Sequence, residues 1–338
     1  LLVGEPGEGF KYMLLLMNNA RIAVGFEAIG LSEAALRLAR DYASQRPSMG
    51  KTIDKHEIIA DYLDEMETDI AGLRALAVRA AFNEEVAQRC RLSRDHLTTE
   101  GGDEWTALDD EFRTRTWRSR LTTPLIKFLA AEKAVEISRR ALQIHGGCGY
   151  TREYGAEKLL RDALVLPIYE GTTQIQALMA TKDALLFVTK NPSQFFRSWA
   201  DERRKAIAGG PLERRVAKLR SQCQAAQLHL MQRIVGGKLK GRSVGAWKTA
   251  LAQWDTRTDF APALLHAERL TQLLADAAIA DALLAQSELD PARGPILERY
   301  LERAEPRARY MLDIIKHTGD RLLRQLADDE LVTDASAA

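Results

Sequence analysis

The chain has 338 residues, which is enough for two domains with sizeable buried cores. Its 48 Lys and Arg and 47 Asp and Glu residues are mixed along the chain, which argues against a nucleic-acid partner. The sequence has no run of about 18 apolar residues that would predict a membrane span, and its three widely spaced cysteines fit neither a disulfide framework nor a zinc site, so we predict a cytoplasmic protein without a bound metal.

The first ten residues predict the end of an upstream domain. Residues 1–10 join a short apolar stretch to a turn rich in glycine and proline, and they contain neither a basic leader nor an initiator methionine. We therefore expect this chain to be a C-terminal piece of a longer polypeptide.

Two long amphipathic helices are expected next. Small and apolar residues recur at helical spacing from residue 12 to about 45, where Pro47 and Gly50 end the pattern. A second helix is expected over about 55–91, because apolar residues return every three or four positions: Ile59, Leu63, Met66, Ile70, Leu73 and Ala77. Helices of this length with one apolar stripe predict antiparallel bundle packing.

The middle of the chain combines a polar segment with three shorter helices. Residues 92–116 are polar and contain a Gly-Gly pair, so we expect an exposed excursion between helices. Helices are expected over about 123–144, 155–164 and 173–190. The first of these runs into Gly146-Gly147-Cys148-Gly149-Tyr150, where three glycines should end it.

Asn191-Pro192 is the clearest boundary signal in the second half. About five further helical stretches follow, including 264–286 and 307–325, and glycine pairs or a proline separate them: Gly209-Gly210, Gly236-Gly237 and Asp290-Pro291. The tail over 328–338 is expected to be disordered. The predicted fold is all-α, with an up-and-down four-helix-type bundle over 11–190 and a second helical domain over 192–327.

Residues 167–176, Pro-Ile-Tyr-Glu-Gly-Thr-Thr-Gln-Ile-Gln, give the strongest indication of chemistry. They place the carboxylate of Glu170 next to Gly171, which lets the backbone approach a ligand closely. The side chains that follow can hydrogen-bond a polar ligand such as a nucleotide: Thr172, Thr173, Gln174 and Gln176. An ordinary helix start explains the same residues, with Glu170 near the positive end of the helix dipole. Both interpretations stay open on this segment alone.

Three other features point to a phosphate-bearing ligand. Arg21 lies in the first half of the first helix, Arg46 at its end, and Gln143 just before the glycine turn. An arginine fork suits phosphate, and the backbone at Gly146-Gly147 can approach a pyrophosphate without side-chain interference. Each feature also has a plain structural explanation, since Gly-Gly-x-Gly often ends a helix and a terminal arginine often satisfies carbonyl groups.

Together, and in this order, these features resemble the C-terminal helical domain of the acyl-CoA dehydrogenase family. The resemblance covers about residues 5–186 and rests on six motifs: Gly7 to Phe10, the segment around Arg21, Arg46 to Gly50, Gln143 to Tyr150, Arg161-Asp162 and Ile168 to Thr172. The residues beyond 186 resemble, more loosely, the helical extension of the 3-methylmercaptopropionyl-CoA dehydrogenase-like branch.

The resemblance implies FAD-dependent α,β-dehydrogenation of an acyl-CoA thioester, as in the β-oxidation of fatty acids. Glu170 matches the catalytic base that removes the α-proton while the β-hydride leaves for N5 of the flavin. Its backbone N–H matches the donor to the thioester carbonyl. Some relatives carry the base immediately before the position of Arg21, but that residue is Ala20 here. Glu170 is therefore the only candidate base.

The resemblance also implies binding residues and partners. Tyr169, Arg21 and Gly171 match positions that contact or admit the acyl-CoA substrate. Other matched positions hold FAD, and those at the end of the first helix and at the glycine turn reach the FAD of a neighbouring subunit: Arg46, Met49, Gln143, Gly146, Gly147, Thr172 and Gln174. This implies a homodimer or tetramer, and electron-transfer flavoprotein is the implied electron acceptor.

Two positions depart from the family pattern, because Met49 stands where an aromatic residue is usual and Asn18 where an aspartate is frequent. The family's N-terminal helical domain and central β-domain are absent, so we expect residues 1–10 to be the end of that β-domain and the fragment to be inactive alone. Two alternatives stay open: an acyl-CoA oxidase, which passes its electrons to oxygen, and a helical oligomerisation module without catalysis. The balanced charge disfavours a DNA-associated relative.

Overall fold

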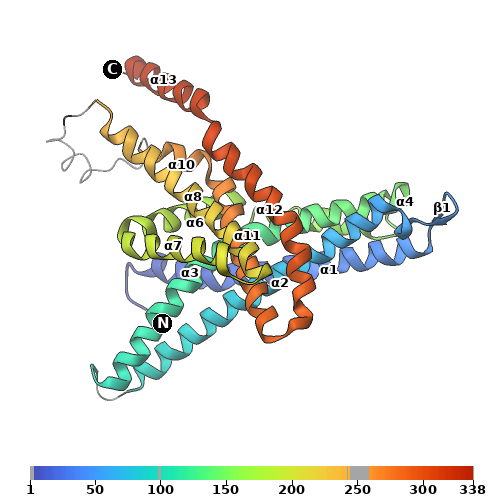
Figure 1. The fold of residues 1–338 in the computed structure, drawn as a ribbon, viewed down its shortest axis with the longest axis horizontal. Coiled ribbons are helices and arrows are strands. Elements are labelled where there is room, and N and C mark those ends of the chain that lie inside the picture. Colours follow the sequence, from blue (N-terminus) through green and yellow to red (C-terminus); the bar gives the residue numbers. More distant parts are fainter. Residues whose placement is uncertain (1–3, 98–99, 242, 244–258, 338) are drawn as a thin grey trace. The chain divides into compact units, whose positions relative to one another are not determined.

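The computed structural model describes residues 4–97, 100–241, 243 and 259–337, and most of them lie in helices (Figure 1). The all-α fold predicted from the sequence is confirmed. Among the described residues, no helix combines the length and the apolar character that crossing a bilayer requires. The same residues contain no group of three or more His, Cys, Asp or Glu side chains placed to hold a metal ion.

Contacts within the chain define two compact units. The first extends up to Gln176 and also includes Ala278–Tyr300. The second consists of Ala177–Ala277 and the chain from Leu301 onward. The first unit therefore contains the predicted Glu170 segment, and it is the unit that positions the candidate site.

These units do not coincide with the predicted domains, which meet at Asn191-Pro192. Two long helices, α11 (Ala267–Leu289) and α12 (Gly294–His317), are separated by the short η3 (Pro291–Arg293), and each contributes one end to the first unit and the other end to the second. A helix of 23 or 24 residues is about 35 Å long. Its two ends can therefore join different cores without any break in the sequence.

Three long helices form the body of the first unit: α1 (Gly9–Gln45), α2 (Glu57–Asp95) and α3 (Asp103–His145). α3 packs along both α1 and α2, and α1 also packs against α2. At the approach of α1 to α3, a Cβ added to Gly25 would lie only 2.8 Å from Cγ1 of Ile126. Small residues thus bring these helices close together, including the fully buried Ala28, Ala35 and Ala39.

The apolar stripe predicted for the second helix faces the core. Ile59 is only half-buried, and the other members of the stripe are buried: Leu63, Met66, Ile70, Leu73 and Ala77. The recurrence at three and four residues therefore identified the correct face of α2.

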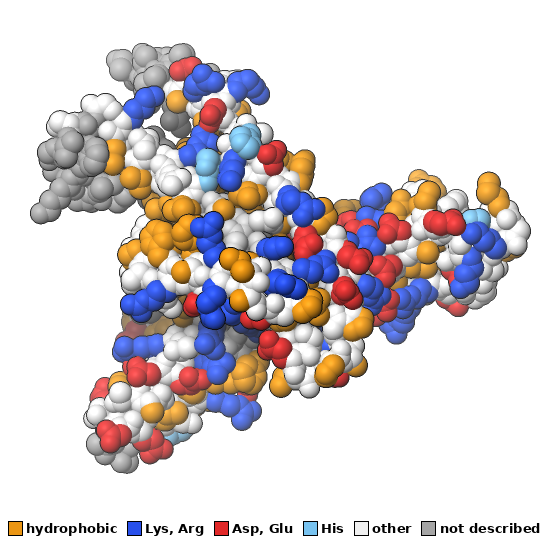
Figure 2. All heavy atoms as spheres, in the orientation of Figure 1, with side chains coloured by type: hydrophobic (Ala, Val, Ile, Leu, Met, Phe, Trp, Pro, Cys, Tyr) orange, Lys and Arg blue, Asp and Glu red, His pale blue; other side chains and the backbone are white. Residues whose placement is uncertain are grey.

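The excursion predicted over residues 92–116 is wrong, since α2 continues to Asp95 and α3 begins at Asp103. The polar residues form a solvated face of two packed helices, and Figure 2 shows acidic and basic side chains together over this end of α2 and α3. Arg94 joins those helices, because its Nη1 lies 2.7 Å from Oδ1 of Asp109 and its guanidinium lies over the Trp105 ring. The acidic side chain of Asp103 in the first turn of α3 also favours a helix start there.

A small β-hairpin joins α1 to α2. Its strands, β1 (Pro47–Ser48) and β2 (Lys51–Thr52), are antiparallel, and η1 (Ile53–Lys55) follows them. Met49 and Gly50 form the tip with φ angles of 46° and 82°. Met49 is 93% exposed, so its thioether projects from the tip and contributes nothing to the core.

Short elements connect α3 to the next long helix. Gly146, with φ 60°, ends α3 as predicted. It is followed by α4 (Gly147–Tyr150), α5 (Ala156–Ala163) and α6 (Thr173–Lys190). The chain between the glycine turn and the segment that carries Glu170 therefore consists of two short helices and their connections.

The second unit contains helices that precede residue 240 and helices that follow residue 260. α7 (Pro192–Ala208) packs against α8 (Pro211–Leu239), and α8 packs against α10 (Ala261–Leu265). α13 (Asp320–Ala337) is the last helix. The core of this unit is aliphatic, with fully buried Leu219, Leu230, Ile234, Leu270 and Leu273.

Three local predictions for the second half are wrong. α8 runs through Gly236-Gly237, because buried Leu230 and Ile234 anchor the helix just before the pair and outweigh its low helix propensity. The helix predicted over 307–325 is interrupted at Gly319, whose φ is 100°. The tail predicted to be disordered from residue 328 is helical to Ala337, and no glycine or proline follows Gly319 to end that helix.

Candidate functional site

Glu170 lies in an irregular turn between α5 and α6, which we call the Glu170 turn (residues 164–172). Two consecutive residues of this turn are left-handed, Glu170 with φ 55° and Gly171 with φ 88°. A Cβ added to Gly171 would lie 2.7 Å from Nε2 of Gln176, so only glycine fits there without a shift. A left-handed glutamate costs roughly 1–2 kcal/mol, so the surroundings must hold this conformation.

Three side chains hold the turn by its carbonyl groups. Arg21 Nε donates to the Glu170 carbonyl at 3.3 Å. Gln176 Nε2 lies 3.2 Å from the same oxygen and 3.3 Å from that of Gly171. Lys127 Nζ donates to the carbonyls of Leu166 and Gly171 at 2.9 and 2.7 Å. A hydrogen bond from a charged donor contributes roughly 1.5–3 kcal/mol, so these bonds outweigh the strain.

The amide groups of the same turn behave differently from its carbonyls. The N–H groups of Glu170, Gly171 and Thr172 have no acceptor among the residues that the structure describes. Thr172 Oγ1 accepts from the N–H of Ile175 at 3.4 Å and so helps to cap α6. The turn therefore binds the protein through its carbonyls and leaves three consecutive donors for another partner.

Two buried cations lie behind the turn. Lys127 is fully buried, and burial together with neighbouring Arg21 lowers the pKa of its ammonium to about 8. Arg21 is 5% exposed, and burial lowers its pKa while Glu170 partly opposes that shift. The Arg21 guanidinium is directed at the Glu170 backbone, and the substrate contact expected for it stays a prediction.

Lys127 was not among the predicted site residues, although the sequence contains a signal for it. It is the only charged residue between Pro124 and Ala131, in an otherwise apolar stretch of α3. A lysine is almost never fully buried unless it is paired or hydrogen-bonded. Such an isolated charge therefore indicates a specific buried partner, here the Glu170 turn.

Tyr169, predicted to contact substrate, directly precedes Glu170 in the turn. Its hydroxyl donates to the carboxylate of Glu27 on α1. Burial raises the pKa of Tyr169, and the bond to Glu27 raises it further. At the start of α6, Thr173 Oγ1 donates to Glu132 Oε1 at 2.6 Å. The Glu170 turn is thus tied to α1 by Tyr169 and to α3 by Thr173.

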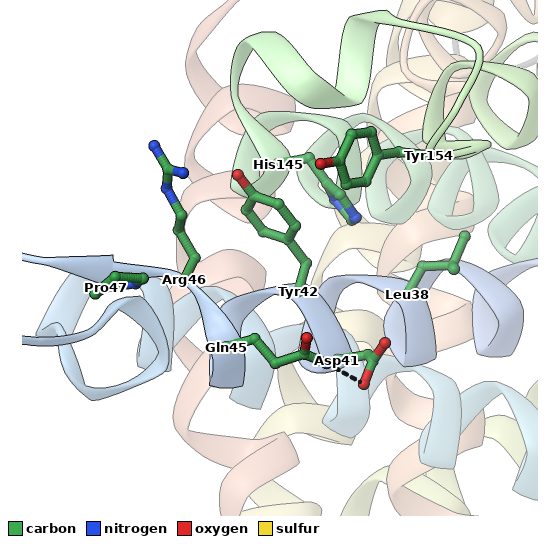
Figure 3. A pocket seen from close by; sticks show the side chains of 8 residues that line it. All are labelled: Leu38, Asp41, Tyr42, Gln45, Arg46, Pro47, His145 and Tyr154. Carbon is green, nitrogen blue, oxygen red and sulfur yellow. Dashed lines mark hydrogen bonds between the residues drawn. The ribbon is translucent and has the colours of Figure 1, made fainter.

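A second group of predicted residues lies where α1 and α3 end. Arg46 lines a cavity of about 310 Å³ with Tyr42, His145 and Tyr154 (Figure 3). In Figure 3 the side chains of Arg46 and Tyr42 extend from the same side of α1, while Gln45 donates to Asp41 on another side. His145 Nδ1 lies 2.7 Å from the Ala141 carbonyl oxygen, which orients the ring in the cavity wall. The cavity therefore combines a guanidinium with aromatic rings.

The glycine turn lies beside this cavity, because it directly follows His145. A Cβ added to Gly146 or Gly147 would meet no atom within 4 Å, so the backbone there is open to a ligand. The side chains of Gln143 and Arg46 are exposed. Met49 is exposed on the hairpin tip, and Gln174 is exposed on the first turn of α6.

The predicted site is therefore divided into two places. Arg21 lies in α1 and Arg46 is the residue that directly follows it, so their separation of 25 residues corresponds to about 37 Å along the helix. The first place gathers the residues expected to handle substrate with one flavin contact: Arg21, Tyr169, Glu170, Gly171 and Thr172. The second gathers residues expected to bind FAD: Arg46, Gln143, Gly146 and Gly147.

The part of the chain that matches known proteins includes the residues of both places in the predicted site. The sequence model of the acyl-CoA dehydrogenase C-terminal domain matches residues 7–95 and 106–185, half of the chain. The 3-methylmercaptopropionyl-CoA dehydrogenase of Ruegeria pomeroyi is 32% identical over 236 residues, which are 67% of this chain and 37% of that protein. A short-chain-specific acyl-CoA dehydrogenase of Megasphaera elsdenii is 32% identical over 185 residues, 55% of this chain and 40% of that protein.

A solved structure shows the same fold over most of the chain. The acyl-CoA dehydrogenase of Bacillus anthracis, crystallised with FAD, matches 96% of this chain and 53% of its own with a TM-score of 0.65 at 16% identity. The chain spans about two fifths of the length of the curated relatives it matches, 37% and 40% for the two named above. From its family match, its sequence identity to these relatives and its helical fold, the chain belongs to the acyl-CoA dehydrogenase family, whose C-terminal domain it contains.

Proposed function

We propose that this chain supplies the catalytic base of an FAD-dependent acyl-CoA dehydrogenase, and that Glu170 removes the α-proton of an acyl-CoA thioester. The observation that carries the proposal is the polarity of the Glu170 turn. Its carbonyls are bound to Lys127, Arg21 and Gln176, whereas the N–H groups of Glu170, Gly171 and Thr172 have no acceptor in the described part of the chain.

The proposed chemistry uses both ends of Glu170. Its half-exposed carboxylate accepts the α-proton, and its backbone N–H donates to the thioester oxygen as negative charge develops there. A donor fixed in place before reaction needs no reorganisation, and one such donor commonly contributes about 10²–10³ in rate. Bound FAD would accept the hydride that leaves the β-carbon. Tyr169 and Gly171 would border the thioester, because they flank the base directly.

The second place fits the diphosphate and adenosine part of FAD. A guanidinium at Arg46 suits a diphosphate, and the open backbone at Gly146 and Gly147 admits its close approach. The rings of Tyr42 and Tyr154 in the cavity of about 310 Å³ offer apolar surface to an adenine. Thr172 and Gln174, at the start of α6, would hold the flavin end of FAD in the first place.

The separation of the two places supports a homodimer or a tetramer. About 37 Å of α1 lies between Arg21 and Arg46, so Arg46 is placed to serve a flavin other than the one beside its own Glu170. Arg46, Met49 and Gln143 are all exposed, as residues that reach a neighbouring subunit must be. We propose electron-transfer flavoprotein as the electron acceptor. A reducing cytoplasm would suit the free thiols Cys90, Cys148 and Cys223.

The decisive test is Glu170→Gln in the complete, FAD-loaded polypeptide. Exchange of the α-proton of an acyl-CoA with deuterated water should fall by about 10²–10⁴-fold, the usual contribution of a general base, while the FAD content per subunit stays unchanged. Glu153→Gln, an exposed glutamate between α4 and α5, is the matched control and should exchange normally. Normal exchange in Glu170→Gln would show that another group is the base.

A further inference from the structure

We propose that Lys127 is a positioning residue for the reaction, because it fixes the backbone turn that directs both the carboxylate and the N–H of Glu170. This inference rests on the proposed function of Glu170 as the base. Lys127 lies on α3 and was not among the predicted site residues, yet it would control the geometry of that site.

Lys127 acts through the backbone, since its side chain is closed off from any ligand of this chain. Its relative exposure is 0%. Its ammonium donates to the carbonyl of Leu166 at 2.9 Å and to that of Gly171 at 2.7 Å. These carbonyls lie four residues before and one residue after Glu170. One buried cation therefore binds the turn on both sides of the base.

Arg21 and Gln176 bond to a shorter part of the turn than Lys127 does. Arg21 binds only the carbonyl of Glu170, and Gln176 binds those of Glu170 and Gly171. Among the described residues, Lys127 alone bonds to the turn both before and after Glu170. Losing it would remove the hydrogen bond to the Leu166 carbonyl, in a part of the turn where neither Arg21 nor Gln176 bonds to it. Thr173 would still bond to the Pro167 carbonyl and Tyr169 to Glu27, so the turn would loosen without unfolding.

The position of Glu170 depends on the same hold. In a peptide group the N–H and C=O point in opposite directions, so the Gly171 carbonyl drawn toward Lys127 leaves the N–H of Thr172 facing away from it. Without the ammonium, the buried Leu166 carbonyl would lose its side-chain donor, and the Gly171 carbonyl would keep only Gln176 Nε2 at 3.3 Å. A shift of the backbone between these two carbonyls would move the N–H and the carboxylate of Glu170 together.

Charged groups of both signs surround the Lys127 ammonium. Arg21 on α1 repels it, whereas Glu132 on α3 and Glu170 in the turn attract it. An amide of similar size would supply donors without that attraction. We therefore expect Lys127→Gln to keep part of the hold and Lys127→Met to lose all of it.

The test compares Lys127→Met and Lys127→Gln with Lys133→Met in the complete, FAD-loaded protein. Lys133 is the matched control, because it is a second buried lysine of α3 and its ammonium pairs with carboxylates, Asp69 and Glu136 at 2.8 Å. The first readout is amide hydrogen exchange of residues 164–173 without substrate. Here the amides of Ile168 and Thr173 are hydrogen-bonded to Val165 and Pro167 and report the turn. The second is the separation of kcat from KM.

Lys127→Met should raise exchange at residues 168–173 by about 10-fold or more and lower kcat by about 10²-fold, the effect expected from a misplacement of about 1 Å. KM should change by less than about 3-fold, Lys127→Gln should be intermediate, and Lys133→Met should leave both readouts at wild-type values once its stability is matched by temperature. If Lys127→Met does not fold, the intermediate values of Lys127→Gln decide the outcome.

The inference is overturned if exchange in the turn is unchanged in the Lys127 variants. It is also overturned if exchange rises but kcat does not fall, since Lys127 would then be structural only. Failure of the proposed function gives a different result, because Glu170→Gln would retain α-proton exchange whatever the Lys127 variants show.

Discussion

Tyr42 stacks on His145, with ring centroids 4.4 Å apart and planes inclined by 26°. This pair fastens the end of α1 to the end of α3, and Tyr154 approaches the Tyr42 ring edge-on at 5.8 Å. Burial raises the pKa of Tyr42, and the nearby Cys148 raises it further. The stack therefore fixes the wall of the cavity that contains Arg46.

We expect Tyr42→Leu to lower the free energy of unfolding of the first unit by about 1 kcal/mol beyond its change in buried area, because an aromatic pair contributes about 0.5–1.5 kcal/mol. Tyr42→Phe keeps the stack and should lose much less. Urea unfolding, followed by a probe in α1 or α3, measures both. Equal losses in the two variants would show that the hydroxyl, not the ring stack, stabilises this end of the bundle.

Gly171→Ala should destabilise the protein more than Gly50→Ala. Both glycines have positive φ, 88° and 82°, so both substitutions carry the strain of a left-handed alanine, about 1 kcal/mol. Only at Gly171 would the new Cβ also meet a side chain, Nε2 of Gln176 at 2.7 Å, whereas nothing lies within 4 Å at Gly50. The difference between the two unfolding free energies therefore measures the close contact, and identical values would contradict this geometry.

Lys127 should make stability increase with pH in the alkaline range. Its folded-state pKa of about 8 lies below its ordinary value of 10.5, so between these values the unfolded chain binds more protons and the free energy of unfolding rises with pH. The shift of 10.5 − 8 = 2.5 units corresponds to at most about 3 kcal/mol. Below pH 8 the cost of the buried charge is fully present.

This prediction is checked by urea unfolding of the wild type and Lys127→Met at about pH 7 and about pH 10. The wild type should gain stability relative to Lys127→Met between these values. Parallel pH curves would show that the Lys127 ammonium is not destabilised by its burial.

In the second unit, Arg307→Ala should cost about 3–5 kcal/mol, because it removes a guanidinium that is paired with a buried carboxylate. Arg307 donates to both oxygens of Asp276 at 2.9 and 2.8 Å, and the Asp276 side chain is fully buried. Arg204→Ala breaks an exposed pair with Asp201 and should cost under about 1 kcal/mol. Thermal unfolding of both variants provides the comparison, and a small loss for Arg307→Ala would mean that water reaches Asp276.

Mixed dimers test whether Arg46 serves the flavin of its partner. Glu170→Gln and Arg46→Ala subunits should each be inactive alone. In a hybrid of the two, one site carries both substitutions and the other carries neither, so coexpression should restore activity. If Arg46 and Glu170 serve the same flavin, every site of the hybrid has one defect and activity stays absent.

The sequence predicts those features of the fold that depend on nearby residues. The stripe on α2 and the end of α3 at Gly146 follow from local spacing and from glycine chemistry. Gly236-Gly237 shows the limit of predictions from nearby residues. The two glycines are poor helix formers, yet they lie within α8 because buried neighbours stabilise the helix. Arg94 shows the same limit. Its contacts to Asp109 and Trp105 stabilise helices in a segment whose polar composition predicts a loop.

For the candidate site as well, the sequence predicts some residues and not others. Glu170 and Gly171 are recognisable in the sequence only together with the other motifs of the family, because the segment alone also fits an ordinary helix start. The role of Lys127 could not be predicted from the sequence, because its partners Leu166 and Gly171 lie 39 and 44 residues further along the chain. Contacts at that separation depend on how the Glu170 turn folds back onto α3, which no local pattern encodes.

The continuous helix α3 carries Lys127 and ends at the glycine turn, 19 residues later. Each residue in a helix adds about 1.5 Å and a rotation of about 100°. A single inserted or deleted residue between these positions would therefore turn the glycine turn away from its present direction relative to Lys127. Length variation should be tolerated in the connection between α2 and α3 and rejected within this stretch of α3, so the spacing of residues here is itself a functional constraint.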